Sequence, residues 1–181
     1  MADLAVSRPD FSKATLTVLI VGLLSLDVLS KVWVRAYVPL HELSTMIPSL
    51  LDLTHVENRG VSFSLLADLS ESVRVPLLVG VSALASLGML YYLYFKLAAE
   101  EAWARLGLAL VIPGAIGNLL DRAIYGQVTD FLHFRWGEIS FFVNNLADCF
   151  ISFGVVALAV ASWQEHRREK NDLRSGQESL S

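Results

Sequence analysis

Two aspartates stand in parts of this chain where a negative charge is costly. Asp148 lies in FFVNNLADCF, a segment within an otherwise apolar stretch, and Asp130 lies in the segment before it. No basic residue adjoins either aspartate in the sequence. Two carboxylates that meet at a partly desolvated site cannot both ionise easily, so they share a proton. One can then act as a base toward water and the other as an acid toward a carbonyl oxygen. This is the chemistry of an aspartic protease, although buried acids would also serve a proton-coupled transporter.

Other polar residues recur at helical spacing within apolar segments. Asp27 and Lys31 are four residues apart, so they share a helix face and can neutralise each other. Asn118, Asp121 and Arg122 also share one face, and we expect Arg122 and Asn118 to hold Asp121 ionised. Charged groups within membrane spans cost roughly 2.5–3.5 kcal/mol each and usually face the inside of a helix bundle. We interpret the Asp27–Lys31 pair and Asp121 as structural.

The composition indicates the elements that position these residues. Apolar side chains make up 54% of the 181 residues and the mean hydropathy is +0.52, both high for a soluble domain. About 20 helical residues are needed to cross a bilayer. The uncharged or nearly uncharged runs predict one all-α membrane domain over residues 1–181. Its four spans are expected at about 14–34, 75–95, 102–122 and 141–163, followed by a polar tail at 164–181.

Two connecting segments show the alternation of short β-strands. Apolar residues alternate in LDLTHVENRGVSFSLL on either side of a turn expected at 57–60, with a second strand over 61–65. The segment TDFLHFRWGEISFF indicates a strand, a turn near Trp136 and Gly137, and a strand that leads into the last helix. We therefore expect a small extracytoplasmic β-sheet on the outer membrane surface.

The distribution of lysine and arginine predicts how the chain crosses the membrane. Cytoplasmic ends of spans carry the excess of these residues. The N-terminal tail, the 2–3 connection and the C-terminal tail hold Arg8, Lys13, Lys96, Arg105, Arg167, Arg168, Lys170 and Arg174. The other side holds Arg35, Arg59, Arg74, Arg122 and Arg135. Both termini are thus predicted to be cytoplasmic. The net charge of −4 gives no indication of nucleic-acid binding.

Four motifs, in order, resemble those of the lipoprotein signal peptidase (signal peptidase II) family, which consists of bacterial integral membrane aspartyl proteases. They are DVLSK from Asp27, NRGVSFS from Asn58, GAIGNLLDRAIYGQVTDF from Gly114, and NNLADCFISFG from Asn144. The resemblance covers residues 14 to 163, which is nearly everything except the tails. It implies a multi-pass protein of the bacterial cytoplasmic (inner) membrane, with its active site near the extracytoplasmic face.

The resemblance also implies roles for individual residues. In that family the catalytic aspartates lie in the V-x-D-F and N-L-A-D motifs, which match Asp130 and Asp148 here, the same pair that the charge argument favours. Residues that match those shaping the substrate site are Asn58, Gly60, Asn118, Arg122 and Asn145. Residues that match those bracing the fold are Asp27, Lys31 and Asp121.

The reaction that the resemblance implies is removal of the signal peptide from diacylglyceryl-modified prolipoproteins, by cleavage just before the lipidated cysteine. The expected partners are lipidated prolipoproteins and membrane lipids, and no metal, cofactor or nucleic acid is expected. Peptide antibiotics of the globomycin type are expected to inhibit. Two alternatives stay open: a small proton-coupled transporter, and a non-catalytic assembly factor in which the buried acids are structural.

Overall fold

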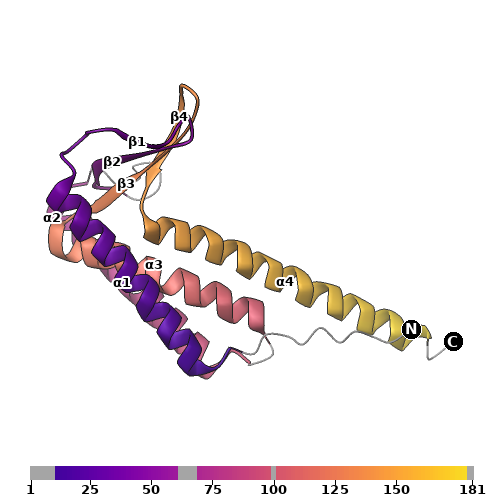
Figure 1. Ribbon diagram of the computed structural model, residues 1–181. Helices are drawn as coiled ribbons and strands as arrows, with labels where there is room; N and C mark the ends of the chain where they lie inside the picture. Colours follow the sequence, from indigo (N-terminus) through magenta and orange to yellow (C-terminus); the bar gives the residue numbers. More distant parts are fainter. Residues whose placement is uncertain (1–10, 61–68, 99–100, 179–181) are drawn as a thin grey trace.

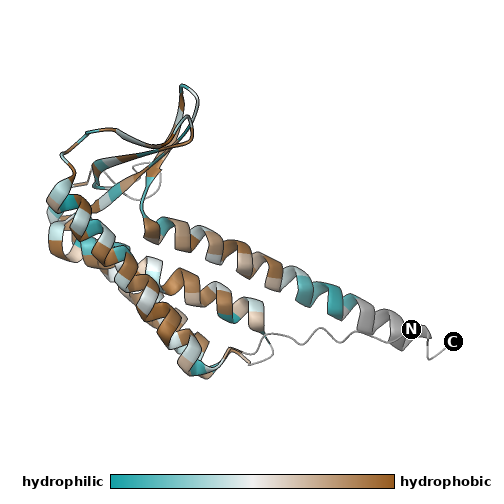
Figure 2. Ribbon diagram, viewed as in Figure 1, coloured by the Kyte–Doolittle hydropathy of each residue, from teal (hydrophilic) through white to brown (hydrophobic). Residues whose placement is uncertain are grey.

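The computed structural model describes residues 11–60, 69–98 and 101–178, and its framework is four long helices (Figure 1). They are α1 Lys13–Tyr37, α2 Glu71–Phe95, α3 Ala102–Tyr125 and α4 Leu146–Glu178. Each contains a segment that is long and apolar enough to cross a membrane, and in α4 this segment is Leu146–Arg168. Figure 2 shows that α4 turns hydrophilic toward the end of this segment. The polar tail expected from residue 164 therefore continues the helix as far as Glu178.

Helix α3 is the centre of the bundle. It packs against each of the other three helices and is the most buried of the four. The outer helices leave large apolar side chains uncovered, such as Val18 and Leu84, which are each 73% exposed. Such surfaces are costly in water and favourable in hydrocarbon. The apolar core fills the half of the bundle farther from the sheet and consists of Leu16, Ile20, Leu93, Leu97, Leu108, Ala109 and Ile112.

Small residues bring α3 and α4 into close contact. A Cβ atom added at Gly114 would collide with the backbone oxygen of Ala147, and one added at Gly154 would lie 2.7 Å from the oxygen of Gly107. Helices in a membrane rely on such close backbone packing, because lipid tails already satisfy apolar side chains. The contact fixes where α4 begins relative to α3, and both helices carry residues predicted to belong to the site.

The four strands form one antiparallel sheet at one end of the bundle (Figure 1). They are β1 Ser44–Ile47, β2 Leu51–Asn58, β3 Val128–Trp136 and β4 Ile139–Asn144, in the order β1-β2-β3-β4. Gly126, with a φ of 72°, ends α3 in the left-handed conformation and lets the chain turn into β3. Asn58 at the end of β2 pairs with Val128 at the start of β3. The sheet thus brings β2 and β3 together directly above α3.

The predicted fold class is confirmed, but two of the predicted boundaries need correction. The fourth span was expected from residue 141, whereas residues 141–144 belong to β4 and α4 begins at Leu146. Phe141, Phe142 and Val143 are apolar in either conformation, so hydropathy alone cannot distinguish a strand from a helix there. Residues 57 and 58, expected in a turn, continue β2 because both pair with β3. The strand expected over 61–65 lies outside the described residues. Strand β1 was not predicted.

The α3–α4 contact makes a testable prediction for stability. Gly114→Ala should destabilise the protein by about 1–3 kcal/mol, because the added methyl group overpacks a tight backbone contact. Gly88→Ala on α2 is the matched control, since a Cβ there meets nothing within 4 Å and alanine favours a helix. Thermal unfolding in detergent micelles would compare the two variants with the parent. Equal stability of both variants would contradict the importance of this contact.

Candidate active site

The two aspartates singled out by charge line the same cavity, which has a volume of about 610 Å³. Asp130 comes from β3 and Asp148 from the first turn of α4. All three strands β2 to β4 and the helices α2, α3 and α4 contribute to the wall, which also contains Asn58, Ser82, Ala115, Asn118, Arg122, Val128, Phe141, Phe142, Val143, Asn144, Ile151 and Ser152. The cavity is therefore polar around the aspartates and more apolar where α4 and β4 border it.

Local structure explains the position of each aspartate. Asp130 is the third residue of β3 and pairs with Val56 of β2, which holds its backbone in the sheet. Asp148 lies at the N-terminus of α4, where the helix dipole favours a negative charge. Asn145 precedes the helix, and its Oδ1 accepts the backbone N–H of Asp148 at 3.0 Å, as an N-cap side chain does.

Three asparagine side chains donate hydrogen bonds to the two carboxylates. The Nδ2 atoms of Asn58 and Asn145 donate to opposite oxygens of Asp130, at 2.9 Å and 2.6 Å. The Nδ2 of Asn118 donates to Oδ1 of Asp148 at 2.8 Å. Within the described residues, Oδ2 of Asp148 accepts no hydrogen bond. Amide donors orient a carboxylate without neutralising its charge.

Burial sets the acid strength of Asp130. This side chain is 3% exposed, and its burial raises the pKa from the ordinary 3.8 to about 6. Burial is the largest cause of this rise. The negative charge of Asp148 also contributes to it, whereas the hydrogen bonds from Asn58 and Asn145 act in the opposite direction. The charge of Asp148 therefore acts on Asp130 across the cavity that both residues line.

Arg122 is buried beside the site but uses its donors on the backbone. Its Nη2 donates to the carbonyl oxygen of Gly60 at 2.8 Å, and its Nη1 donates to that of Asn118 at 3.3 Å. The backbone N–H of Gly60 in turn donates to Oδ1 of Asn58 at 3.0 Å. Arg122 therefore fixes the end of β2 against α3, while its charge acts on both Asp130 and Asp148.

A second polar cluster lies behind the cavity, between α1 and α3. The Nζ of Lys31 lies 2.9 Å from Oδ2 of Asp27 and 3.5 Å from Oδ2 of Asp121, and it donates to Oδ1 of Asn118 at 2.9 Å. Asp27 and Lys31 are both fully buried. The predicted pairing of Asp27 with Lys31 is confirmed. Asp27 also accepts the backbone N–H of Ala147 at 2.9 Å, which attaches the start of α4 to α1.

The direct partners of Asp121 differ from the predicted Arg122 and Asn118, although the charge of Arg122 also acts on Asp121. Its carboxylate lies 3.0 Å from Nη1 of Arg35 and accepts the backbone N–H of Thr129, also at 3.0 Å. Arg35 further donates to Oγ1 of Thr129 at 2.6 Å. The predicted partners lie on α3 with Asp121, whereas the packing of α1 against α3 supplies Lys31 and Arg35. A signal was present, because residues 27, 31 and 35 repeat at intervals of four along one face of α1.

The structure thus divides the predicted site residues into two groups. Asn58, Asn118 and Arg122 line the cavity with the two aspartates, while Asn145 and Gly60 lie directly behind this lining. Asp27, Lys31 and Asp121 form the cluster behind it. Sequence reasoning did not identify Arg35, Thr129 or the two hydroxyl residues of the cavity wall, Ser82 and Ser152.

The chain is similar to known proteins over most of its length. The family model described as Signal peptidase (SPase) II matches residues 19–164. The lipoprotein signal peptidase of Streptococcus pneumoniae is 35% identical over 153 residues, which cover 84% of this chain and 95% of that protein. The lipoprotein signal peptidase of Geobacter sulfurreducens is 38% identical over 150 residues, covering 83% and 92%.

Two solved structures of bacterial membrane enzymes share the fold. One superposes with a TM-score of 0.76 at 20% sequence identity and covers 87% of this chain and 92% of its own. The other has a TM-score of 0.73 at 22% identity, with coverage of 84% and 94%. At these identities the similarity concerns the arrangement of the helices and the sheet.

The electrostatics of the cavity predict how Asp130 titrates. In the parent protein its carboxyl group should be half protonated near pH 6, and mostly ionised above that pH. Asp148→Asn should lower this pKa because it removes a nearby negative charge, and Asn58→Ala should raise it because it removes a donor to the ionised form. Infrared difference spectra of the carboxyl C=O band, with Asp130→Asn to identify the band, would measure both shifts.

Asn144→Ala is the matched control for these spectra. Asn144 also lines the cavity, but no hydrogen bond joins its side chain to the described residues, so the pKa of Asp130 should not change. An Asp130 that titrates near its ordinary 3.8 in all variants would contradict the burial and the proximity described above.

Proposed function

Because the chain belongs to the signal peptidase II family, we propose that it is an aspartic endopeptidase acting on diacylglyceryl-modified prolipoproteins. It removes the signal peptide by cleavage just before the lipidated cysteine. One observation carries the proposal of aspartic chemistry: Asp130 and Asp148, from separate elements, line one cavity, and the hydrogen-bond donors that hold them are asparagine amides. Paired carboxylates held in this way are suited to acid–base chemistry on an amide bond.

The two aspartates differ in their surroundings, and this difference suggests separate roles. Asp148 has one oxygen held by Asn118, and its Oδ2 is available to a water molecule. Asp130 has both oxygens held and a pKa raised by burial to about 6, so it retains a proton more readily. We assign Asp148 as the base that activates water and Asp130 as the acid. Arrival of a substrate excludes water and raises the pKa of Asp130 further.

The reaction then needs no group beyond these side chains and water. Asp148 takes a proton from water as its oxygen attacks the scissile carbonyl carbon, while Asp130 donates its proton to the carbonyl oxygen. The tetrahedral intermediate collapses when the oxygen returns its proton to Asp130 and the C–N bond breaks. The leaving amine of the cysteine takes the proton held by Asp148. Both carboxyl groups end the cycle as they began it.

The cavity wall suggests how the substrate lies. Ala115, Ile151 and Ser82 extend the cavity from the aspartates along α3, α4 and α2, the three helices that border it. A signal peptide can thus be presented at the membrane surface while its acyl chains stay in the bilayer. Asn58 and Arg122, with the backbone of Gly60, border the path of the peptide. Peptide antibiotics of the globomycin type would compete for this cavity.

Asn118 and Asn145 were predicted to bind substrate, and the geometry supports a different role. The Nδ2 atoms of both are already donated to the aspartates. Asn145 is fully buried and also caps α4. We propose that these two residues act on the reaction through the carboxylates that they orient.

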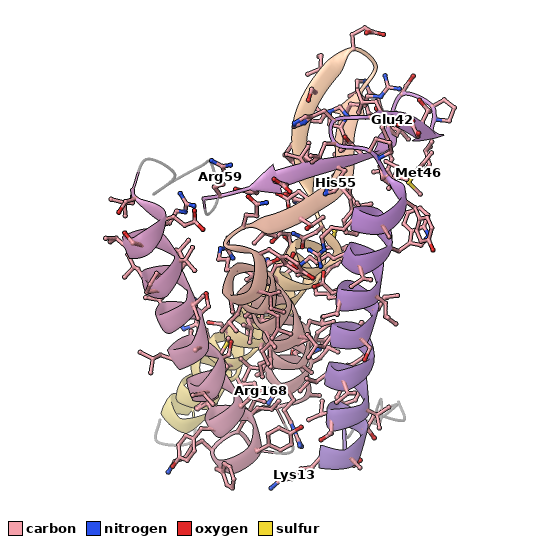
Figure 3. The ribbon with its side chains drawn as sticks, turned by 90° about the vertical axis from the view of Figure 1, so that its left-hand side faces the viewer. Lys13, Glu42, Met46, His55, Arg59 and Arg168 are labelled. Carbon is pink, nitrogen blue, oxygen red and sulfur yellow. The ribbon has the colours of Figure 1, made fainter. Side chains whose placement is uncertain are left out.

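We propose that the protein lies in the cytoplasmic (inner) membrane with both termini inside and the sheet outside. Lys13 and Arg168 lie toward one end of the bundle, whereas Glu42, Met46, His55 and Arg59 lie toward the other (Figure 3). The excess of lysine and arginine belongs to the first end, which is the cytoplasmic one under the charge rule for membrane proteins. The aspartates then lie near the extracytoplasmic face, where prolipoproteins emerge.

Substitution of either aspartate tests the reaction. Asp130→Asn and Asp148→Asn should each lower the rate of cleavage of a lipidated prolipoprotein by at least about 10³-fold, because asparagine cannot exchange a proton. The double variant should be no slower than either single one, since the pair acts as one unit. Purified enzyme in detergent and a mass-spectrometric cleavage assay would give the rates.

Glu138→Gln is the matched control, because it removes a carboxylate from the exposed turn after β3 without touching the cavity. It should cleave at the parent rate. If Asp130→Asn or Asp148→Asn protein is folded and still cleaves well, the aspartic mechanism is wrong. Absence of cleavage by the parent protein, with transport or assembly defects in its deletion strain, would instead favour one of the two non-proteolytic alternatives.

The proposed orientation has an independent test that uses the single cysteine of the chain. In a Cys149→Ser background, Glu138→Cys should react with a membrane-impermeant maleimide in intact spheroplasts. Glu165→Cys should react only after the membrane is broken, because it lies at the opposite end of α4 from the sheet. Labelling of both cysteines from outside would exclude the proposed orientation.

A further inference from the structure

The three asparagines that hold the aspartates share one arrangement. In each of them the Nδ2 faces an aspartate, and the Oδ1 accepts a hydrogen bond from a different donor. For Asn58 this donor is the backbone N–H of Gly60, and for Asn145 it is the backbone N–H of Asp148. For Asn118 it is the charged side chain of Lys31, at 2.9 Å. The oxygen is thus anchored every time, and the anchor decides which end of the amide faces the carboxylate.

Such anchoring matters because a carboxamide has two ends of similar shape and opposite hydrogen-bonding character. An ammonium group only donates and an ionised carboxylate only accepts. An asparagine between Lys31 and Asp148 therefore has one orientation in which both contacts are favourable. If Asn118 rotated by half a turn, its oxygen would face Oδ1 of Asp148 and its NH₂ would face the ammonium of Lys31. Both contacts would then be repulsive.

All three donors of the Lys31 ammonium group are accounted for by contacts within the protein. It is fully buried, and an ammonium group has three N–H donors. Its Nζ lies 2.9 Å from Asp27, 2.9 Å from Asn118 and 3.5 Å from Asp121. The contacts with Asp27 and Asp121 neutralise the charge of Lys31. The contact with Asn118 connects this ion-pair cluster to the cavity.

We propose that Lys31 is a positioning residue for the reaction. By anchoring the oxygen of Asn118, it turns the NH₂ group toward Oδ1 of Asp148 and leaves Oδ2 of Asp148 directed to the attacking water. This proposal rests on the proposed aspartic mechanism and adds one residue to it. Among the described residues, Lys31 contacts neither Asp130 nor Asp148 directly, and it lies outside the lining of the cavity. Lys31 was predicted to be structural only.

The charge of Lys31 adds a second effect on the pair. Burial raises the pKa of Asp130, and the positive charge of Lys31 opposes this rise. The other charged groups around Lys31 and the pair are Asp27 and Arg35 on α1, Asp121 and Arg122 on α3, Asp148 on α4 and Asp130 on β3. Removing the charge of Lys31 should therefore shift the pH profile of the enzyme to higher pH.

The test separates an effect on positioning from an effect on folding, because both charges of the Asp27–Lys31 pair are removed at once. Lys31→Met alone would leave Asp27 without its partner in the membrane, so the informative variant is Asp27→Asn with Lys31→Met. Asp27→Asn alone is the matched control, because it keeps Lys31 on Asn118. Relative to this control, the double variant should lose about 10- to 100-fold in kcat, the range typical for residues that orient catalytic groups. Its KM should change little, and its kcat/KM profile should move to higher pH.

A double-mutant cycle tests whether the effect passes through Asn118. In an Asn118→Ala background, Lys31→Met with Asp27→Asn should cost no further kcat relative to Asp27→Asn, because the amide to be oriented is gone. A full and independent loss in that background would overturn the proposed route. So would a double variant with the kcat and the pH profile of Asp27→Asn at equal thermal stability.

Asp148→Asn, measured in the same assay, distinguishes this proposal from the one on which it rests. If Asp148→Asn remains active, the aspartic mechanism fails and the role of Lys31 fails with it. If Asp148→Asn is inactive and the Lys31 double variant matches its control, the positioning role alone is wrong.

Discussion

A charge within a lipid-facing helix bundle must be met by groups of the protein itself, and this constraint organises the half of the molecule that carries the site. Two acids and two bases meet between α1 and α3: Asp27, Lys31, Arg35 and Asp121. Their charges sum to zero. Their remaining hydrogen bonds reach the backbone of Ala147 at the start of α4 and of Thr129 in β3. The cluster that makes burial of charge tolerable is also what joins the elements carrying Asp148 and Asp130.

The proposed catalytic pair is supported in a different way. Asp130 and Asp148 receive amide donors from Asn58, Asn118 and Asn145, and no ion pair within 4.0 Å holds either of them in the described part of the chain. A close ion pair would hold a carboxylate in its ionised form. This suits an aspartate that stabilises the fold, but not one that must exchange a proton. Neutral donors fix the geometry and leave the charge free to change. The protein therefore uses two kinds of support for two kinds of aspartate.

The sequence allowed prediction of what depends on local spacing and average hydropathy. Four apolar stretches indicated four helices, and spacing along α1 indicated that Asp27 pairs with Lys31. The absence of a neighbouring base, together with the family motifs, pointed to Asp130 and Asp148. The features that could not be predicted from the sequence depend on contacts between distant segments. The partners of Asp121 come from α1, and the strand β1 exists because β2 offers it an edge. The start of α4 was missed although its signal was present. Asn145 and Asp148 have the spacing of an N-cap residue and of the residue whose backbone N–H donates to the cap side chain. The apolar residues before Asn145 obscured this signal.

The place of Asp148 has a consequence for how the protein is made. This residue lies on the last of the four helices, and Asn145, which caps that helix, also donates a hydrogen bond to Asp130. A chain that is still leaving the ribosome has inserted α1 to α3 and carries Asp130, but it has neither the second carboxylate nor the amide that holds the first. Hydrolytic capacity on this account appears only when biosynthesis is complete. Under the proposed mechanism, a nascent chain cannot hydrolyse a peptide bond before α4 is made.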